Sequence, residues 1–180
     1  STAKADDILV WDGGNGHQGT DNVVAVLTAL GHTVTRQATF PADMSVFDTI
    51  YAMDYLNGPD DAAEQQVIAS FLASDRGVFA QFEWDCCTNS QINWTATLAP
   101  LLNDPFQISG SQGLNQDSIA EPNEPFGLTT TPNAIPFLQI NATANIVQIP
   151  ADNVVFRLNG TPVVGAYVQT QFVSGAGCVV

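Results

Sequence analysis

The segment Asp7-Ile-Leu-Val-Trp-Asp12 (DILVWD) is a short apolar run bounded by carboxylates. A continuous apolar run of this length is typical of a strand that is buried on both faces of a parallel sheet. A glycine-rich turn follows at residues 13–19 (GGNGHQG), and we expect a helix over residues 22–30 that ends at Gly31. The segment therefore predicts a strand–turn–helix unit at the start of the fold.

The same alternation continues through the first half of the chain. Further strands are expected at residues 32–38, 47–53 and 77–82, and further helices at residues 59–74 and 89–102. Strands that alternate with helices favour a parallel sheet covered by helices on both faces. The first half therefore predicts an α/β fold.

The second half has a different composition. Residues 103–136 are rich in Pro, Gly, Asn and Ser, and we expect them to form a long irregular insertion. Short strands are expected after it, at residues 145–149, 153–158, 162–169 and 171–180. Asn159-Gly160 lies between two of these strands and is the strongest hairpin signal in the chain. At 180 residues the chain is expected to form a single domain.

The charge balance excludes whole classes of partner. The chain has 18 acidic and 4 basic residues, a net charge of -14, and its basic residues are Lys4, Arg36, Arg76 and Arg157. Nucleic acids and anionic lipid surfaces are bound by clustered Lys and Arg, so neither is expected as a partner. No apolar stretch is long enough to insert into a membrane.

Composition also bears on location. Few lysines among many Thr, Asn and Gln residues are typical of a secreted bacterial protein, so we expect a secreted or cell-surface location. The last residues, Cys178-Val-Val, form an apolar run without a turn residue, which predicts that this chain is part of a longer polypeptide.

Three stretches together resemble the trehalose-utilisation-type proteins of the class I glutamine amidotransferase-like superfamily. They are the strand, glycine turn and helix of residues 7–31, the helix and strand of residues 60–83, and the closing hairpin and final strand of residues 153–180. The resemblance covers residues 6–102 and 145–180. It implies a flavodoxin-like three-layer sandwich with a mostly parallel central sheet and a C-terminal β-hairpin.

The chain departs from that superfamily at the catalytic positions. Active members carry a cysteine in a glycine-flanked turn after a central strand, and a partner histidine late in the chain. Here the matching place is residues 81–89 (QFEWDCCTN), where Cys86 and Cys87 have no flanking glycines, and the only histidines, His17 and His32, lie early. The resemblance therefore predicts a domain without amidotransferase activity that acts as a ligand-binding or interaction module.

The candidate binding site follows from the expected sheet. Ligands of such folds bind beyond the carboxyl ends of the strands, where the strand order reverses. The glycine loop could present N–H groups to an anion, and Tyr55 and Trp84 could stack on a sugar ring, so a small molecule or a carbohydrate is the expected ligand. The candidate ligand-binding residues are Asp12, Asn15, Gly16, His17, Asp54, Tyr55, Glu83, Trp84 and Asp85.

One alternative is a cysteine-dependent hydrolase. Cys86 or Cys87 would be the nucleophile, its thiol activated at the start of the following helix, and His17 would be the base. The competing interpretation is a buried thiol or a disulfide, either between the two neighbours or from one of them to Cys178.

A second alternative is a metal-dependent carbohydrate-processing enzyme. Asp12, Asp54, Glu83 and Asp85 would repel one another at one edge of the sheet unless a cation relieved them. Oxygen ligands from several loops suit Ca²⁺ or Mg²⁺. The competing interpretation, in which each acid caps a turn or faces water, needs no cofactor, and none is otherwise expected.

Overall fold

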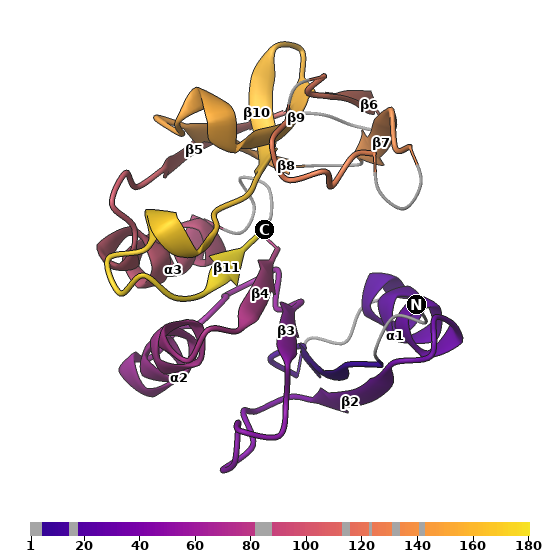
Figure 1. Ribbon diagram of the computed structural model, residues 1–180, viewed down its shortest axis with the longest axis vertical. Coiled ribbons are helices and arrows are strands. Elements are labelled where there is room, and N and C mark those ends of the chain that lie inside the picture. Colours follow the sequence, from indigo (N-terminus) through magenta and orange to yellow (C-terminus); the bar gives the residue numbers. More distant parts are fainter. Residues whose placement is uncertain are drawn as a thin grey trace.

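The computed structural model describes residues 5–14, 18–81, 88–112, 116–122, 124–130, 134–140 and 143–180. One part of it is a five-stranded parallel sheet in the order β11-β4-β3-β1-β2 (Figure 1). Its strands are β1 (Asp7–Trp11), β2 (Thr33–Gln37), β3 (Thr49–Ala52), β4 (Gly77–Ala80) and β11 (Cys178–Val179). The parallel sheet expected from the first half of the chain is therefore present.

Strand β1 is buried on both faces, as its apolar run predicts. Leu9 and Trp11 belong to the main apolar cluster, whereas Ile8 and Val10 point to the opposite face and belong to a second cluster. None of these four side chains is more than 3% exposed. Burying each one contributes about 1.5–3 kcal/mol, so β1 is the centre of this part of the core.

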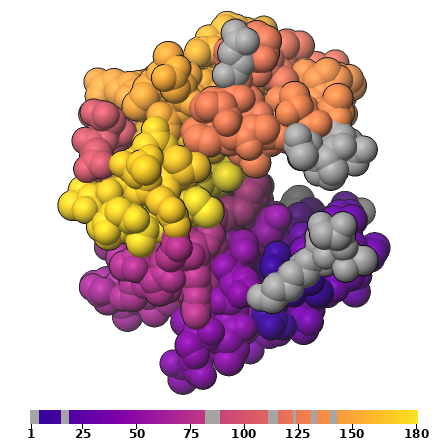
Figure 2. Space-filling model, viewed as in Figure 1, coloured from indigo at the N-terminus to yellow at the C-terminus, as the bar shows by residue number. Residues whose placement is uncertain are grey.

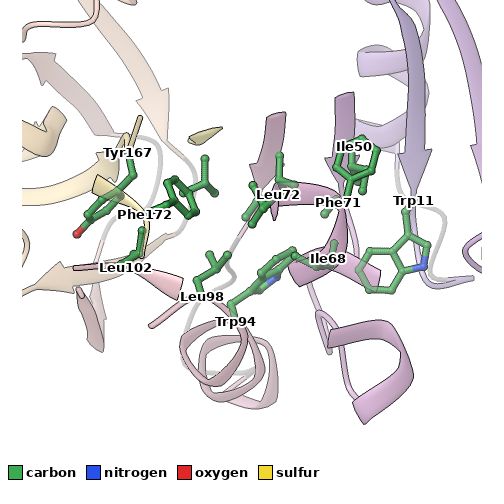
Figure 3. Close-up of a cluster of buried hydrophobic side chains, with 14 of the residues drawn as sticks. Trp11, Ile50, Ile68, Phe71, Leu72, Trp94, Leu98, Leu102, Tyr167 and Phe172 are labelled. Carbon is green, nitrogen blue, oxygen red and sulfur yellow. The ribbon is translucent and has the colours of Figure 1, made fainter. Parts of the chain in front are cut away.

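Helices cover the two faces of the sheet unequally. Helix α1 (Gln18–Ala29) packs on the side of Ile8 and Val10. Helices α2 (Ala62–Ala73) and α3 (Thr88–Leu98) pack on the other side. Figure 3 shows that second cluster as a continuous row of side chains, which runs from Trp11 past Trp94 to Tyr167. The row joins the parallel sheet to the second half of the chain.

The second half forms antiparallel sheets (Figure 1). One has the order β10-β9-β6-β7, and the other pairs β5 with β8. The strands are β5 (Gln107–Gln112), β6 (Gln116–Ala120), β7 (Phe137–Ile140), β8 (Thr143–Val147), β9 (Val154–Leu158) and β10 (Thr161–Gly165). Single 3-10 turns are η2 (Ala99–Leu101), η3 (Ala151–Asn153) and η4 (Gln169–Gln171).

The prediction of a flavodoxin-like three-layer sandwich is wrong. The described residues contain more strand than helix, 33% against 27%, because antiparallel sheets accompany the parallel one. Between β4 and β11 the chain forms α3 and then the six antiparallel strands, where a sandwich of that type would cross over by a helix. Among the described helices, only α1 contributes side chains to the cluster on its face of the sheet. The stacked pair Tyr51 and Phe79, with ring centroids 5.2 Å apart, lies half-buried on that same face.

The segment 103–136 also differs from its expected irregular form, since it contains β5 and β6. Their sequences, QISGSQ and QDSIA, contain few apolar residues and therefore give little periodic signal. The expected strand over residues 171–180 is reduced to β11. The hairpin at Asn159-Gly160 is confirmed, because β9 and β10 pair antiparallel and both turn residues have positive φ, 51° and 83°.

No described helix is both long and apolar enough to cross a lipid bilayer.

The start of α2 is held by a reciprocal cap. The Asp61 side chain accepts a hydrogen bond from the Glu64 N–H at 2.8 Å, and the Glu64 carboxylate accepts one from the Asp60 N–H at 3.0 Å. Burial raises the pKa of the Glu64 carboxyl group above its usual 4.5; the hydrogen bond from the Asp60 N–H acts in the opposite direction, and the charges of nearby aspartates, including Asp54, raise the pKa further. Keeping Glu64 ionised in the folded protein therefore lowers the free energy of unfolding.

Replacing Glu64 with Gln should stabilise the protein at neutral pH. A carboxyl whose pKa is higher in the folded state than in the unfolded state makes stability fall as pH rises through the interval between the two values. Gln keeps the hydrogen bond to Asp60 but cannot ionise. The melting temperature of Glu64→Gln should exceed that of the wild type at neutral pH, and the difference should shrink as pH is lowered from the raised folded-state pKa toward the usual Glu value of 4.5. A difference that grows on acidification would contradict this cause.

Candidate functional site

The carboxyl ends of β1 and β3 meet at one edge of the parallel sheet. Asp12 directly follows β1, and Asp54 lies just beyond β3. The Met53 N–H donates to the Trp11 carbonyl at 2.7 Å, and the Gly13 backbone lies against the Asp54 carboxylate, where an added Cβ would be 2.0 Å from Oδ2. The strand order reverses between β1 and β3, which is the position expected of a ligand site. The predicted convergence of these two acids is therefore correct.

Asp12 is bonded to its own protein on both carboxylate oxygens. Its Oδ2 accepts from Nε of Arg36 at 2.6 Å, and its Oδ1 accepts from the Gly14 N–H at 3.0 Å. The Arg36 guanidinium also bonds Asp21, in the first turn of α1. The hydrogen bond to Asp12 is the main cause that raises the pKa of Arg36. The group Asp12–Arg36–Asp21 thus joins β1, β2 and α1, with Asp12 only 6% exposed.

Asp54 forms part of a tight loop between β3 and α2. Its Oδ1 accepts from the Asn57 N–H at 3.3 Å, and its carbonyl accepts from the Gly58 N–H at 3.0 Å. Helix α3 holds the other side of this loop, since Asn93 donates to the Asn57 carbonyl at 2.8 Å. Gly58 approaches the Trp94 ring so closely that an added Cβ would be 2.8 Å from it. Asp54 is 4% exposed, so its carboxylate is integral to the loop.

The remaining predicted site residues divide into two groups. Tyr55 is half-buried and lies in the same loop as Asp54, at the edge of the sheet. The others lie outside the described residues: Asn15, Gly16, His17, Glu83, Trp84, Asp85, Cys86 and Cys87. Within the described part of the chain, no three His, Cys, Asp or Glu side chains are grouped so that they could hold a metal ion.

Trp11, at the end of β1, and Cys178, in β11, have local roles. Trp11 is fully buried, stacks on Phe40 with ring centroids 4.6 Å apart, and donates to the Ala38 carbonyl at 3.1 Å. Cys178 carries a free, exposed thiol. Partial desolvation and the charge of Asp75 raise the pKa of that thiol, which disfavours the reactive thiolate. Neither group points to catalysis.

An apolar pocket lies at the carboxyl ends of β4 and β11, where the two halves of the chain meet. Tyr167 lines it, and its hydroxyl group donates to the Asp104 carbonyl at 3.2 Å. Burial raises the pKa of that hydroxyl. The lining residues are Ala80, Leu98, Phe106, Ile146, Ile149, Gly165, Tyr167, Val179 and Val180. Because the Tyr167 hydroxyl group is already hydrogen-bonded, the described lining offers apolar contacts and no free polar side chain that would orient a ligand.

A different surface exposes apolar side chains. On β6 and β7, Ile119 and Phe137 lie directly opposite each other and are 62% and 51% exposed. Ile135, 39% exposed, lies on the same segment two positions before Phe137, whereas Leu138, also 39% exposed, is on the opposite face of β7. Ile119, Ile135 and Phe137 are called the β6–β7 surface below. The antiparallel sheets that carry it form one end of the molecule, away from α1 and α2 (Figure 2).

Sequence reasoning missed Arg36 as the partner of Asp12. The sequence did offer a signal: Arg36 is one of only 4 basic residues, and it lies inside the strand expected at residues 32–38. Arg36 pairs in register with Val10, so it shares a face with Asp12, but that register is known only from the structure. The β6–β7 surface was missed because residues 103–136 were expected to be irregular and no strand was expected at Phe137–Ile140.

Comparisons with known proteins identify a likeness to a solved structure. No family model and no curated protein matches the chain. Among solved structures, the exo-beta-1,4-mannosidase Op5Man5 from Opitutaceae bacterium strain TAV5 superposes with a TM-score of 0.54 and 14% sequence identity. The match covers 97% of this chain but 30% of that enzyme's chain. At this identity the likeness shows a shared fold alone, and this chain spans less than a third of that enzyme.

Removing Arg36 should destabilise the fold measurably. Arg36→Met would leave the buried Asp12 carboxylate without its cation, and we expect a loss on the order of 2–3 kcal/mol, less than for a fully buried pair because Arg36 is partly exposed. Urea unfolding measures this loss. The double variant Arg36→Met/Asp12→Asn should recover part of it, since the unpaired charge is then gone. A change in the free energy of unfolding of about 0.5 kcal/mol or less, which is usual for a surface substitution, would show that the Asp12–Arg36 pair does not stabilise the fold.

Proposed function

We propose that this chain is a non-catalytic module, of the amidotransferase-like type that its sequence resembles, which binds a ligand or a partner. We place it in a secreted or cell-surface protein, as one part of a longer polypeptide. In this proposal it has no amidotransferase activity and needs no cofactor.

The observation that carries the proposal is the state of the two described acids at the sheet edge. Asp12 is neutralised by Arg36, and Asp54 accepts from the backbone of its own loop. Both are at least nine-tenths buried. A general acid, a general base or a metal ligand needs a carboxylate that can face a substrate or an ion, and these two are occupied by the fold.

The structural likeness supports a modular role. The mannosidase chain contains a region of this fold that accounts for 30% of its length. A fold that occurs as a minor part of a long carbohydrate-acting chain is consistent with an accessory domain. We therefore propose that this chain serves beside a carbohydrate-acting partner.

The proposal predicts that the purified chain does not hydrolyse amides, esters or mannosides. Chromogenic substrates of each class should give no turnover above that of a heat-denatured sample. The variants Cys86→Ala and Cys87→Ala should behave as the wild type does, because neither thiol is a nucleophile in this proposal. Turnover that either substitution abolishes would establish the cysteine hydrolase instead, with His17→Ala as the test of its base.

The proposal also predicts no specific response to divalent cations. Because Asp12 is already paired with Arg36, millimolar Ca²⁺ or Mg²⁺ should leave the melting temperature unchanged. Differential scanning fluorimetry with and without chelator measures this. A rise that the chelator reverses, and that Asp54→Asn removes, would instead support the metal-dependent enzyme.

A further inference from the structure

Strand β7 is an edge strand that contributes little to the core. It ends the four-stranded sheet, paired with β6 on one side. Successive side chains of a strand point to opposite faces, yet Phe137 and Leu138 are 51% and 39% exposed. Consecutive apolar residues in a strand are typical of burial on both faces, whereas here the side chain on each face is at least 39% exposed.

The hydrogen-bonding direction of β7 follows from its contacts with β6. The Ala120 N–H donates to the Pro136 carbonyl at 3.0 Å, and the Ser118 hydroxyl group donates to the Leu138 carbonyl at 2.9 Å. In an antiparallel pair, inward- and outward-facing backbone groups alternate, so those of Phe137 and Gln139 face away from β6. Within the described chain, no backbone hydrogen bond to Phe137 or Gln139 is formed on that outer side.

The open edge has an apolar centre. Ile119 and Phe137 form a non-hydrogen-bonded pair, the type whose side chains approach most closely. Ile135 lies two positions before Phe137 and is also exposed. A free row of backbone donors and acceptors beside exposed apolar side chains is the arrangement to which an extended segment adds as a further strand.

The charges near this edge are negative. Asp117 is exposed and lies opposite Gln139. Glu124 accepts hydrogen bonds from the N–H groups of Phe126 and Thr129, which carry no full positive charge. The nearest described cation, Arg157, is bonded to Glu121 and to a backbone carbonyl. Arg157 pairs in register with Ile119, but Glu121 offsets its charge, so the charged side chains named around the apolar centre have a net negative charge because of Asp117 and Glu124.

The other described arginines do not offset that negative charge. Arg36 is bonded to Asp12 and Asp21, and Arg76 donates to the Met44 and Ser45 carbonyls. The chain carries a net charge of -14. A second copy would bring the same charge to the edge, whereas a basic segment would be attracted to it.

We propose that β7 is a docking edge that accepts an extended, Lys- or Arg-rich segment of a partner protein as an added strand. The inference rests on the proposed interaction role and names its partner chemistry. The partner backbone would bond the outward groups of Phe137 and Gln139. Its apolar side chains would cover the β6–β7 surface, and its basic side chains would lie near Asp117.

The test uses a fluorescein-labelled octapeptide of alternating Lys and Val, with an alternating Glu and Val peptide as the charge control. Fluorescence anisotropy should show binding of the basic peptide alone, weakening as salt is raised. Gln139→Pro removes an outward N–H to which no acceptor is found among the described residues, and proline is tolerated at such positions of an edge strand. This variant and Phe137→Asp should each weaken binding about tenfold or more.

The matched control is Ile92→Asp on α3, which changes an apolar side chain away from the edge that is 64% exposed, against 51% for Phe137. It should bind as the wild type does, and circular dichroism should show that all variants are folded. Three results would each overturn the inference: no binding of the basic peptide at millimolar concentration, equal binding by Gln139→Pro, or self-association of the chain that Phe137→Asp abolishes.

These outcomes are distinct from failure of the proposed function. Hydrolytic turnover would remove the non-catalytic role while leaving peptide binding at β7 intact. Loss of peptide binding without turnover would remove the docking edge alone.

Discussion

The burial of β1 on both faces is the constraint on which the rest of the fold depends. An apolar strand with side chains at most 3% exposed needs neighbours on both edges and cover on both faces. Strands β2 and β3 supply the edges, α1 covers one face, and α2 and α3 cover the other. Because the flanking strands are parallel to it, their carboxyl ends and that of β1 lie at one edge of the sheet.

That edge is where ligands bind in many parallel sheets, yet here its described acids are used by the fold. Asp12 holds Arg36, which in turn holds the first turn of α1, and Asp54 closes its own loop against Gly13. Burial of these carboxylates is tolerated because each has hydrogen-bond donors. Asp12 and Asp54 therefore do not supply the free carboxylates that the expected catalytic or metal-binding site needs. The exposed apolar side chains of the β6–β7 surface lie at the far end of the molecule.

Local patterns predicted the local structure well. The apolar run of β1 and the Asn159-Gly160 turn each encode their element in a few residues, and the convergence of Asp12 with Asp54 follows from parallel pairing. The antiparallel half was not predictable in the same way, because β5 and β6 lack apolar alternation and are held by distant partners. The Asp12–Arg36 pair depends on strand register, and the exposure of Phe137 depends on sheet order. Neither is visible in sequence spacing.

Amide hydrogen exchange, measured residue by residue by NMR, tests most directly the contrast between a locked sheet and an open edge. The amides of Leu9 and Val10 in β1 should exchange only through global unfolding. In the free protein, the outward amides of Phe137 and Gln139 should exchange close to the rate of an unstructured peptide. Protection at Phe137 and Gln139 comparable to that in β1 would contradict the open edge, because those N–H groups would then already have partners.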